Sequence, residues 1–102
     1  MKSLLHRYAK DGNITGLQQC LNNGVKIDSH DEYARTPLII AAIYDQMNTV
    51  EYLMKNGADI NAMDDNKQTV LALVLHNKKA FTLPAVATVF KKSSDYLKRI
   101  DE

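Results

Sequence analysis

The apolar residues in the middle of the chain fall at helical spacing in two short runs. Three residues of each run lie at intervals of three and four: Leu38, Ala41 and Ala42 in the first, and Val50, Leu53 and Met54 in the second. This spacing puts each set on one face of a helix. The more polar residues around Asp45-Gln46 separate the two runs. The pattern predicts a short helix that begins at Thr36-Pro37, followed by a second helix over about 48–56.

The residues that flank these runs predict where the helices begin and end. A threonine hydroxyl can accept a hydrogen bond from a free backbone N–H, and proline suits the first helical position, so Thr36-Pro37 predicts a helix start. Gly57 follows the second run, where a left-handed backbone is easiest for glycine. The chain then enters an exposed turn, from which we expect Ile60 to face the core.

The same pattern recurs at an offset of 33 residues. Moving forward by that offset aligns Asp31, Thr36, Leu38 and Ala41 with Asp64, Thr69, Leu71 and Val74. Moving back by it aligns Leu38, Gly57 and Ile60 with Leu5, Gly24 and Ile27. A fixed period in this range indicates an array of stacked units, each of which buries its apolar face only against its neighbours.

The densest repeat resembles a known family. Its run D-x-x-x-x-T-P-L-x-x-A-A, followed by V-x-x-L-M-x-x-G-A-D-I-N-A, is similar to a nearly complete ankyrin repeat. The resemblance implies an all-α solenoid of helix-turn-helix units joined by β-turns, in a single domain over 1–102. Repeat 1 covers about 1–30, repeat 2 about 31–63, and repeat 3 with a C-terminal cap about 64–102.

The first and third repeats depart from the family pattern. Ser3-Leu4-Leu5-His6 stands where the family has T-P-L-H, and the resemblance implies that His6 ties neighbouring turns together by hydrogen bonds. Phe90 stands where Gly57 would recur. Apolar residues at helical spacing after Thr82-Leu83-Pro84 predict an extended capping helix over 83–99, or two helices broken near Ser93-Ser94. The alternative is that this segment docks onto a partner.

The composition narrows the class of protein. The net charge of +1 does not favour nucleic-acid binding, which needs a clustered basic face. No apolar run approaches the roughly 18 residues of a membrane span or makes a signal peptide. A single cysteine, Cys20, fits a reducing compartment. We therefore expect a cytoplasmic protein that binds neither nucleic acid nor membranes.

No group of residues predicts catalysis, a cofactor or a metal site. The three histidines and Cys20 lack metal-ligand spacing. Cys20 aligns with Leu53 and is predicted to be a small buried residue, whereas His30 is predicted to be exposed. Asp31 and Asp64 occupy turn positions, where aspartate hydrogen-bonds its own backbone. The sequence predicts a protein that is not an enzyme.

The resemblance implies a binding surface along the turn tips and the inner helices, here called the binding strip. Its residues by alignment are Glu32, Tyr33, Arg35, Ile43, Tyr44, Asp65, Asn66, Gln68, His76 and Asn77. In repeat 1 the matching helix positions hold Lys10 and Asp11. Tyrosine and arginine dominate interface hot spots, so repeat 2 is the main candidate. Whether Arg35 pairs with Glu32 or with a carboxylate of the partner is left open.

These observations predict a small adaptor or inhibitor that binds one protein partner and is itself a monomer. An alternative is a structural protein that homodimerises through its apolar C-terminal helix or an under-capped end. A third reading is that the chain is a fragment of a larger ankyrin protein.

Overall fold

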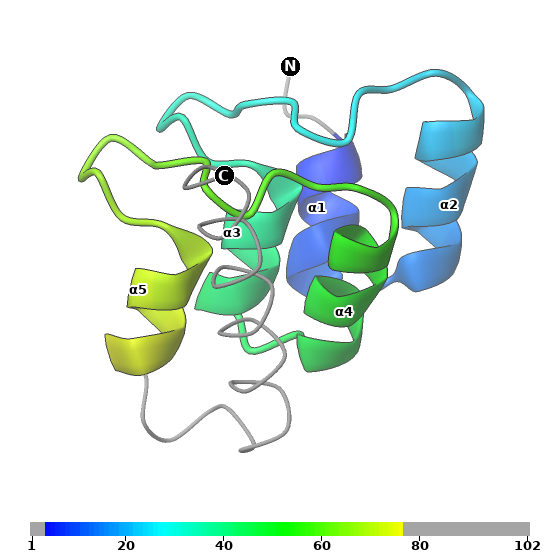
Figure 1. Cartoon of the computed structure of the whole chain (residues 1–102). Coiled ribbons are helices and arrows are strands. Elements are labelled where there is room, and N and C mark those ends of the chain that lie inside the picture. Colours follow the sequence, from blue (N-terminus) through cyan, green and yellow to red (C-terminus); the bar gives the residue numbers. More distant parts are fainter. Residues whose placement is uncertain (1–3, 77–102) are drawn as a thin grey trace, which may run out of the picture.

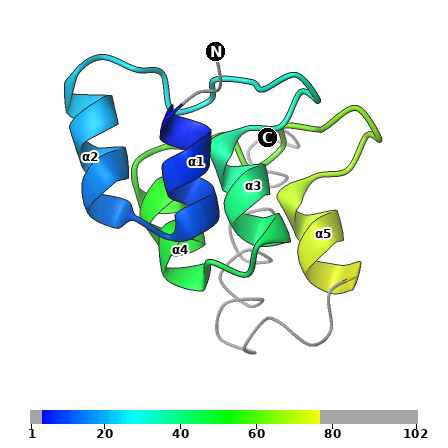
Figure 2. The same ribbon diagram turned by 180° about the vertical axis from the view of Figure 1, so that it is seen from behind.

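The computed structural model describes residues 4–76, which form helices and the turns between them, with no strand in that range. The helices are α1 (Leu4–Asp11), α2 (Ile14–Asn22), α3 (Pro37–Ile43), α4 (Met47–Lys55) and α5 (Val70–His76). Helices α1, α3 and α5 stand side by side in one row, and α2 and α4 pack against it (Figures 1 and 2). The predicted all-α repeat array is confirmed for this range. The predicted capping helix over 83–99 lies outside the described residues.

The local signals in repeat 2 place its helices within one residue of the prediction. Helix α3 begins at Pro37, and the hydroxyl of Thr36 accepts a hydrogen bond from the N–H of Ile39 at 3.3 Å. Thr69 repeats this cap, accepting from the N–H of Ala72 at 3.3 Å. Helix α4 spans Met47–Lys55, where 48–56 was predicted.

The backbone repeats as regularly as the sequence. Left-handed conformations occur at three pairs of positions 33 residues apart: Gly12 and Asp45, Gly24 and Gly57, and Ala34 and Lys67. Within a pair φ differs by at most 10°, as in Gly12 at 72° and Asp45 at 62°. For a residue other than glycine this conformation costs about 1 kcal/mol. The turn hydrogen bonds offset that cost, for example the bond from the N–H of Ala34 to the carbonyl of Asp31 at 3.1 Å.

The core lies between the two rows of helices. Every residue from Thr36 to Ala42 is buried, so α3 is enclosed on all sides. The predicted apolar stripes of α3 and α4 are buried, and Ile27 and Ile60 pack against the core as partly buried residues. Cys20 was predicted to be buried and is only half-buried, although it too packs against the core. Repeat 1 has a described neighbour on one side only, so its helix α2 is covered less completely than α4 is.

Candidate functional site

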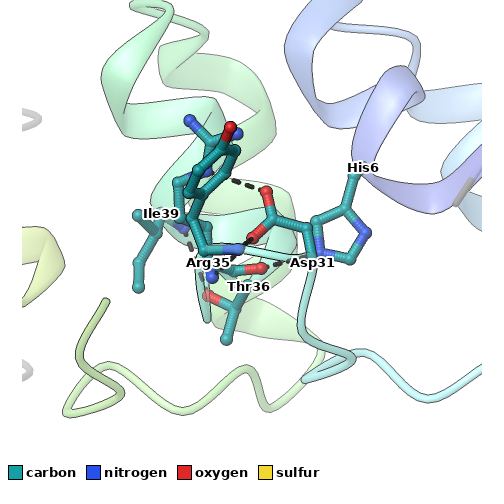
Figure 3. Close-up of polar contacts among 6 residues, drawn as sticks. His6, Asp31, Arg35, Thr36 and Ile39 are labelled. Atoms are coloured by element: carbon teal, nitrogen blue, oxygen red, sulfur yellow. Dashed lines mark hydrogen bonds and ion pairs between the residues drawn. The ribbon is translucent and has the colours of Figure 1, made fainter. Parts of the chain in front are cut away.

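The turn tip before α3 is built on one carboxylate. Oδ1 of Asp31 accepts hydrogen bonds from the backbone N–H groups of Tyr33 at 2.9 Å and Arg35 at 2.8 Å. Its Oδ2 accepts from Nε of Arg35 at 2.8 Å, which completes an ion pair (Figure 3). The sequence left open a pairing of Arg35 with Glu32. In the structure the partner of Arg35 is Asp31.

The same tip recurs one repeat later with one difference. Oδ1 of Asp64 accepts from the backbone N–H groups of Asn66 and Gln68, both at 2.9 Å. The predicted role of these aspartates in their own turns is confirmed. Gln68 replaces Arg35, so the second tip has the hydrogen bonds without the ion pair. Arg35 therefore makes the first tip the more constrained of the two.

The surroundings of Asp31 favour its ionised form. Partial burial raises its pKa, but the hydrogen bonds from the backbone of Arg35 and Tyr33 and the Arg35 guanidinium outweigh burial and hold the pKa below its usual value. The carboxylate is charged at neutral pH and acts as a fixed anchor for the turn.

Hydrogen bonds between repeats fix the tips relative to the helices. Nε2 of His6, on α1, donates to the carbonyl oxygen of Arg35 at 2.7 Å (Figure 3). Because a carbonyl only accepts, the proton lies on Nε2. The N–H of Asp65 donates to the carbonyl of Tyr33 at 3.1 Å. The predicted tie through His6 is confirmed, and both tips are held in place by neighbouring repeats.

Two exposed tyrosines flank α3, and a cation lies over each ring. Tyr33 is 54% exposed and has the Arg35 guanidinium carbon 4.9 Å from its ring centroid. Tyr44 is 43% exposed and has Nζ of Lys10 5.0 Å from its ring centroid. A cation over an aromatic face restrains both side chains and is worth about 0.5–1 kcal/mol at an exposed site. Lys10 comes from repeat 1, so the second pair also joins two repeats.

The predicted strip residues fall into three groups. The exposed members are Glu32, Tyr33, Tyr44, Asp65 and Asn66. The half-buried members are Arg35, Ile43 and Gln68. His76 is the last residue of α5, but its side chain lies outside the described part of the chain, as does the whole of Asn77.

The described residues of the strip form two groups, one at each end of α3. The tips carrying Tyr33 and Asp65 are held together by their hydrogen bond. Tyr44 follows the other end of α3, a helix of 7 residues and hence roughly 10 Å long. The strip therefore runs along the length of one short helix.

Sequence reasoning missed two contacts at the site. It named Lys10 as a strip position without pairing it with Tyr44, and it did not foresee that Nε2 of Gln46 donates to the carbonyl of Lys10 at 2.9 Å. Both contacts join residues more than 30 positions apart, and no local pattern signals them. The Asp31–Arg35 pair had no local signal either, because an acid and a base four positions apart face each other predictably on a helix, and these two residues lie in a turn.

The described part of the chain has neither a metal-binding cluster nor a membrane-spanning helix. Among the side chains that the structure describes, no three or more His, Cys, Asp or Glu residues form a cluster that could hold a metal ion. None of the helices in that range combines the length and apolar character needed to cross a membrane.

The repeats of this chain are similar to those of known proteins. A family model described as ankyrin repeats in three copies matches residues 4–93. Inversin from Danio rerio is 34% identical over 71 residues, which covers 70% of this chain and 7% of that protein. Ankyrin repeat protein B18 of variola virus is 35% identical over 67 residues, which is 65% of this chain and 12% of that protein. The chain thus spans only a small part of the length of these relatives.

Proposed function

The chain belongs to the ankyrin repeat family, and from that premise we propose that it is a non-enzymatic adaptor or inhibitor that binds one folded protein through the binding strip. Ankyrin repeats generally mediate protein–protein interaction. The half-buried, unpaired Cys20 suits a reducing compartment, so we place this activity in the cytoplasm.

The observation that carries the proposal is the pair of exposed tyrosines, each restrained by a cation. Tyrosine and arginine contribute most to interface hot spots because they bury a large area or make forked hydrogen bonds. An exposed side chain normally loses about 0.5–1.5 kcal/mol of conformational freedom when a partner immobilises it. The Arg35–Tyr33 and Lys10–Tyr44 contacts restrict that freedom in advance. A partner would therefore meet side chains that are already largely ordered.

The buried helix beneath the strip supports a rigid mode of binding. All the residues of α3 before Ile43 are buried, and hydrogen bonds to α1 and to the next turn hold the tip in place. A surface of this kind keeps its shape on binding and suits a partner with a preformed complementary face. A standard interface needs about 800 Å² from each side, which would occupy most of the inner face of three repeats.

The test is affinity capture from a lysate of the source cells with three versions of the protein. These are the unaltered chain, a Tyr33→Ala/Tyr44→Ala variant, and a Met63→Ala control that truncates a side chain of similar exposure outside the strip. Both tyrosines are exposed, so circular dichroism should show an intact fold for every version. We expect a protein that the unaltered chain and the control retain and the double variant loses by at least about tenfold. Equal retention by all three versions would contradict the assignment of the strip.

A second reading is that the chain works as one segment of a larger ankyrin protein. The observation in its favour is that the chain covers 7% of the length of the inversin relative and 12% of the viral one. In that case the strip would be part of a longer binding surface, and capture with this chain alone would give weak retention. Self-assembly through a C-terminal helix concerns residues outside the described range, and it remains a prediction.

A further inference from the structure

Two asparagines in the chain are each followed by a glycine. They are Asn23-Gly24, after α2, and Asn56-Gly57, after α4, at equivalent positions of repeats 1 and 2. All four residues are exposed. Asn56 is exposed although repeat 1 packs against repeat 2, so a further repeat packed against repeat 1 in the same way would leave Asn23 accessible as well.

An asparagine before a glycine is prone to lose its side-chain amide. The backbone nitrogen of the glycine attacks the side-chain carbonyl carbon, and no Cβ crowds that nitrogen. At Asn23 a bond would form between the nitrogen of Gly24 and Cγ, and the bond between Cγ and Nδ2 would break. Nδ2 leaves as ammonia and takes up the proton of the Gly24 N–H. Water, the only other reactant, then opens the cyclic succinimide to aspartate or isoaspartate.

The folded backbone holds both asparagines in the same unreactive conformation. The ψ angles of Asn23 and Asn56 are 6° and 13°, which place the nitrogen of the following glycine next to the nitrogen of the asparagine itself. Ring closure needs the glycine nitrogen beside Cβ instead, so each turn must open locally before it reacts. The backbone resists opening equally, because the N–H groups of Gly24 and Gly57 donate to helix carbonyls at 3.1 and 3.2 Å.

The two turns differ in the side chain that would react. Nδ2 of Asn56 donates to the carbonyl oxygen of Tyr52, one helical turn earlier, at 2.7 Å. Gln19 has the place of Tyr52 in repeat 1, but within the described part of the chain the side chain of Asn23 makes no hydrogen bond. The amide of Asn56 has to give up a hydrogen bond before it turns towards its glycine, whereas the amide of Asn23 does not.

We propose that Asn23 is a site of spontaneous deamidation, that it reacts before Asn56, and that its product loosens the end of α2. The additional hydrogen bond should make the reaction at Asn56 about two- to tenfold slower than at Asn23. The proposal concerns repeat 1 and does not depend on the binding strip, whose tyrosines lie in repeat 2.

The product is unfavourable where it forms. Asn23 is the C-terminal cap of α2, and a new carboxylate there lies at the negative end of the helix dipole. Helix α2 contains no charged residue, so no basic side chain of its own offsets the carboxylate. Isoaspartate also lengthens the backbone directly before Gly24, whose φ of 90° the turn requires. Both changes weaken the link from α2 to the following turn.

Peptide mapping by mass spectrometry tests the reaction on the full chain. The folded protein would be kept at physiological temperature and mildly alkaline pH, in water enriched in the heavy isotope of oxygen, and sampled over several weeks. A product formed during the incubation contains the heavy oxygen and is thus distinguished from material that reacted earlier. Fragmentation that separates isoaspartate from aspartate identifies the succinimide route, because direct hydrolysis of the amide gives aspartate alone.

The unfolded chain in guanidinium chloride is the matched control. Each rate in the folded chain is divided by the rate of the same asparagine in the unfolded chain, so that the influence of sequence neighbours cancels. We expect the normalised rate of Asn23 to exceed that of Asn56 by about two- to tenfold. An equal or higher normalised rate at Asn56 would overturn the proposal. So would a folded chain without isoaspartate at Asn23 after a period that converts the unfolded chain.

Three substitutions test the consequence for α2. Asn23→Asp reproduces the charge of one product and should lower the thermal midpoint by about 2–6 °C. Asn23→Gln has a longer side chain that does not close the same ring, so it should lose less thermal stability during incubation than the unaltered chain. Asn56→Gln is the control and should lose as much as the unaltered chain. An unchanged midpoint for Asn23→Asp, or equal losses for all three incubated proteins, would refute the loosening of α2.

Discussion

Repeats 1 and 2 have the same backbone conformation but different surroundings. Both contain two helices joined by a left-handed residue, Gly12 in one and Asp45 in the other, and both continue through a left-handed glycine after the second helix. Yet α3 is buried along nearly its whole length, whereas α1 exposes Leu4, Arg7 and Lys10. The same position is thus interior or surface according to the number of neighbours, and each side chain has to suit its place in the stack.

Two contacting positions show this adaptation in detail. Repeat 2 has Ala41 and Thr49, both buried, where repeat 1 has Tyr8 and Gly16. The ring of Tyr8 lies so close to Gly16 that a Cβ added there would be 2.8 Å from the ring atoms. Repeat 1 therefore has a large residue on α1 against a glycine on α2, whereas repeat 2 has a small residue on α3 and a larger one on α4.

The largest expected difference in stability between the two repeats comes from exchanging a residue between equivalent positions. Ile40→Arg gives repeat 2 the residue of repeat 1, but Ile40 is 4% exposed and the guanidinium would be buried without a partner. We expect a loss of more than about 4 kcal/mol, enough to unfold most molecules. Arg7→Ile makes the opposite change at a side chain that is 75% exposed, and it should alter stability by less than about 0.5 kcal/mol. Urea denaturation followed by circular dichroism measures both, and similar midpoints would refute the role of neighbours.

The contact between Tyr8 and Gly16 offers a test of the adaptation itself. Gly16→Ala should destabilise the chain by about 1–3 kcal/mol, because the ring of Tyr8 must move. Tyr8→Ala removes the obstacle, so the double variant should be more stable than the sum of the two single changes predicts. A double-mutant cycle in urea measures this coupling. Additive effects would show that the two residues do not constrain each other.

Removing the helix cap should cost more stability in an enclosed repeat than in a less enclosed one. Thr36→Ala removes a fully buried cap of α3 and should cost about 1–2 kcal/mol. Thr69→Ala removes the same hydrogen bond at a half-buried site and should cost about 0.5–1 kcal/mol. Equal thermal midpoints for the two variants would show that burial does not modulate the cap.

The ion pair between Asp31 and Arg35 at the first tip should make the stability of the chain depend on pH. Asp31 has a lowered pKa in the folded state, so its contribution to stability is present above the ordinary pKa of about 3.9 and is lost as the pH falls through the folded value. Asp31→Asn should therefore cost about 1 kcal/mol at pH 7 and progressively less below pH 4. Denaturation at several pH values measures the difference. A gap that stays constant down to about pH 3 would contradict it. Asp64→Asn, at the tip without an arginine, is the matched control.

The smallest expected effect concerns the contact that joins the two repeats at the surface. Lys10→Ala and Tyr44→Ala should couple by about 0.5 kcal/mol, the value for an exposed cation–π pair. A cycle run in parallel with Lys55→Ala in place of Lys10→Ala should show no coupling. A coupling below about 0.2 kcal/mol in the first cycle would mean that Lys10 does not restrain the tyrosine.

The sequence predicts the fold well because its signals are local. The cap at Thr36, the glycine at Gly57 and the spacing of the apolar residues each act within a few positions, and together they place α4 within one residue. The aspartate turns are predicted for the same reason.

The details of the site are harder to predict because they depend on side chains from different turns or repeats. The left-handed backbone at Ala34 shapes the tip in which Asp31 is the ion-pair partner of Arg35, a choice that the order of residues alone did not decide. The placement of Lys10 over Tyr44 depends on how two helices pack. Cys20 aligns with Leu53 yet is half-buried, because repeat 1 has a described neighbour on one side only.

The hydrogen bonds between repeats bear on how fast the chain folds. His6 with Arg35, Asp28 with Asp59, and Lys10 with Gln46 join residues 29, 31 and 36 positions apart. Each bond therefore closes a loop of about one repeat, and none of the three spans two. Chains whose contacts are short in sequence reach the native state quickly, because little loop entropy is lost before each contact forms. Folding can thus begin at repeat 2, which has the most enclosed helix, and extend outward one repeat at a time.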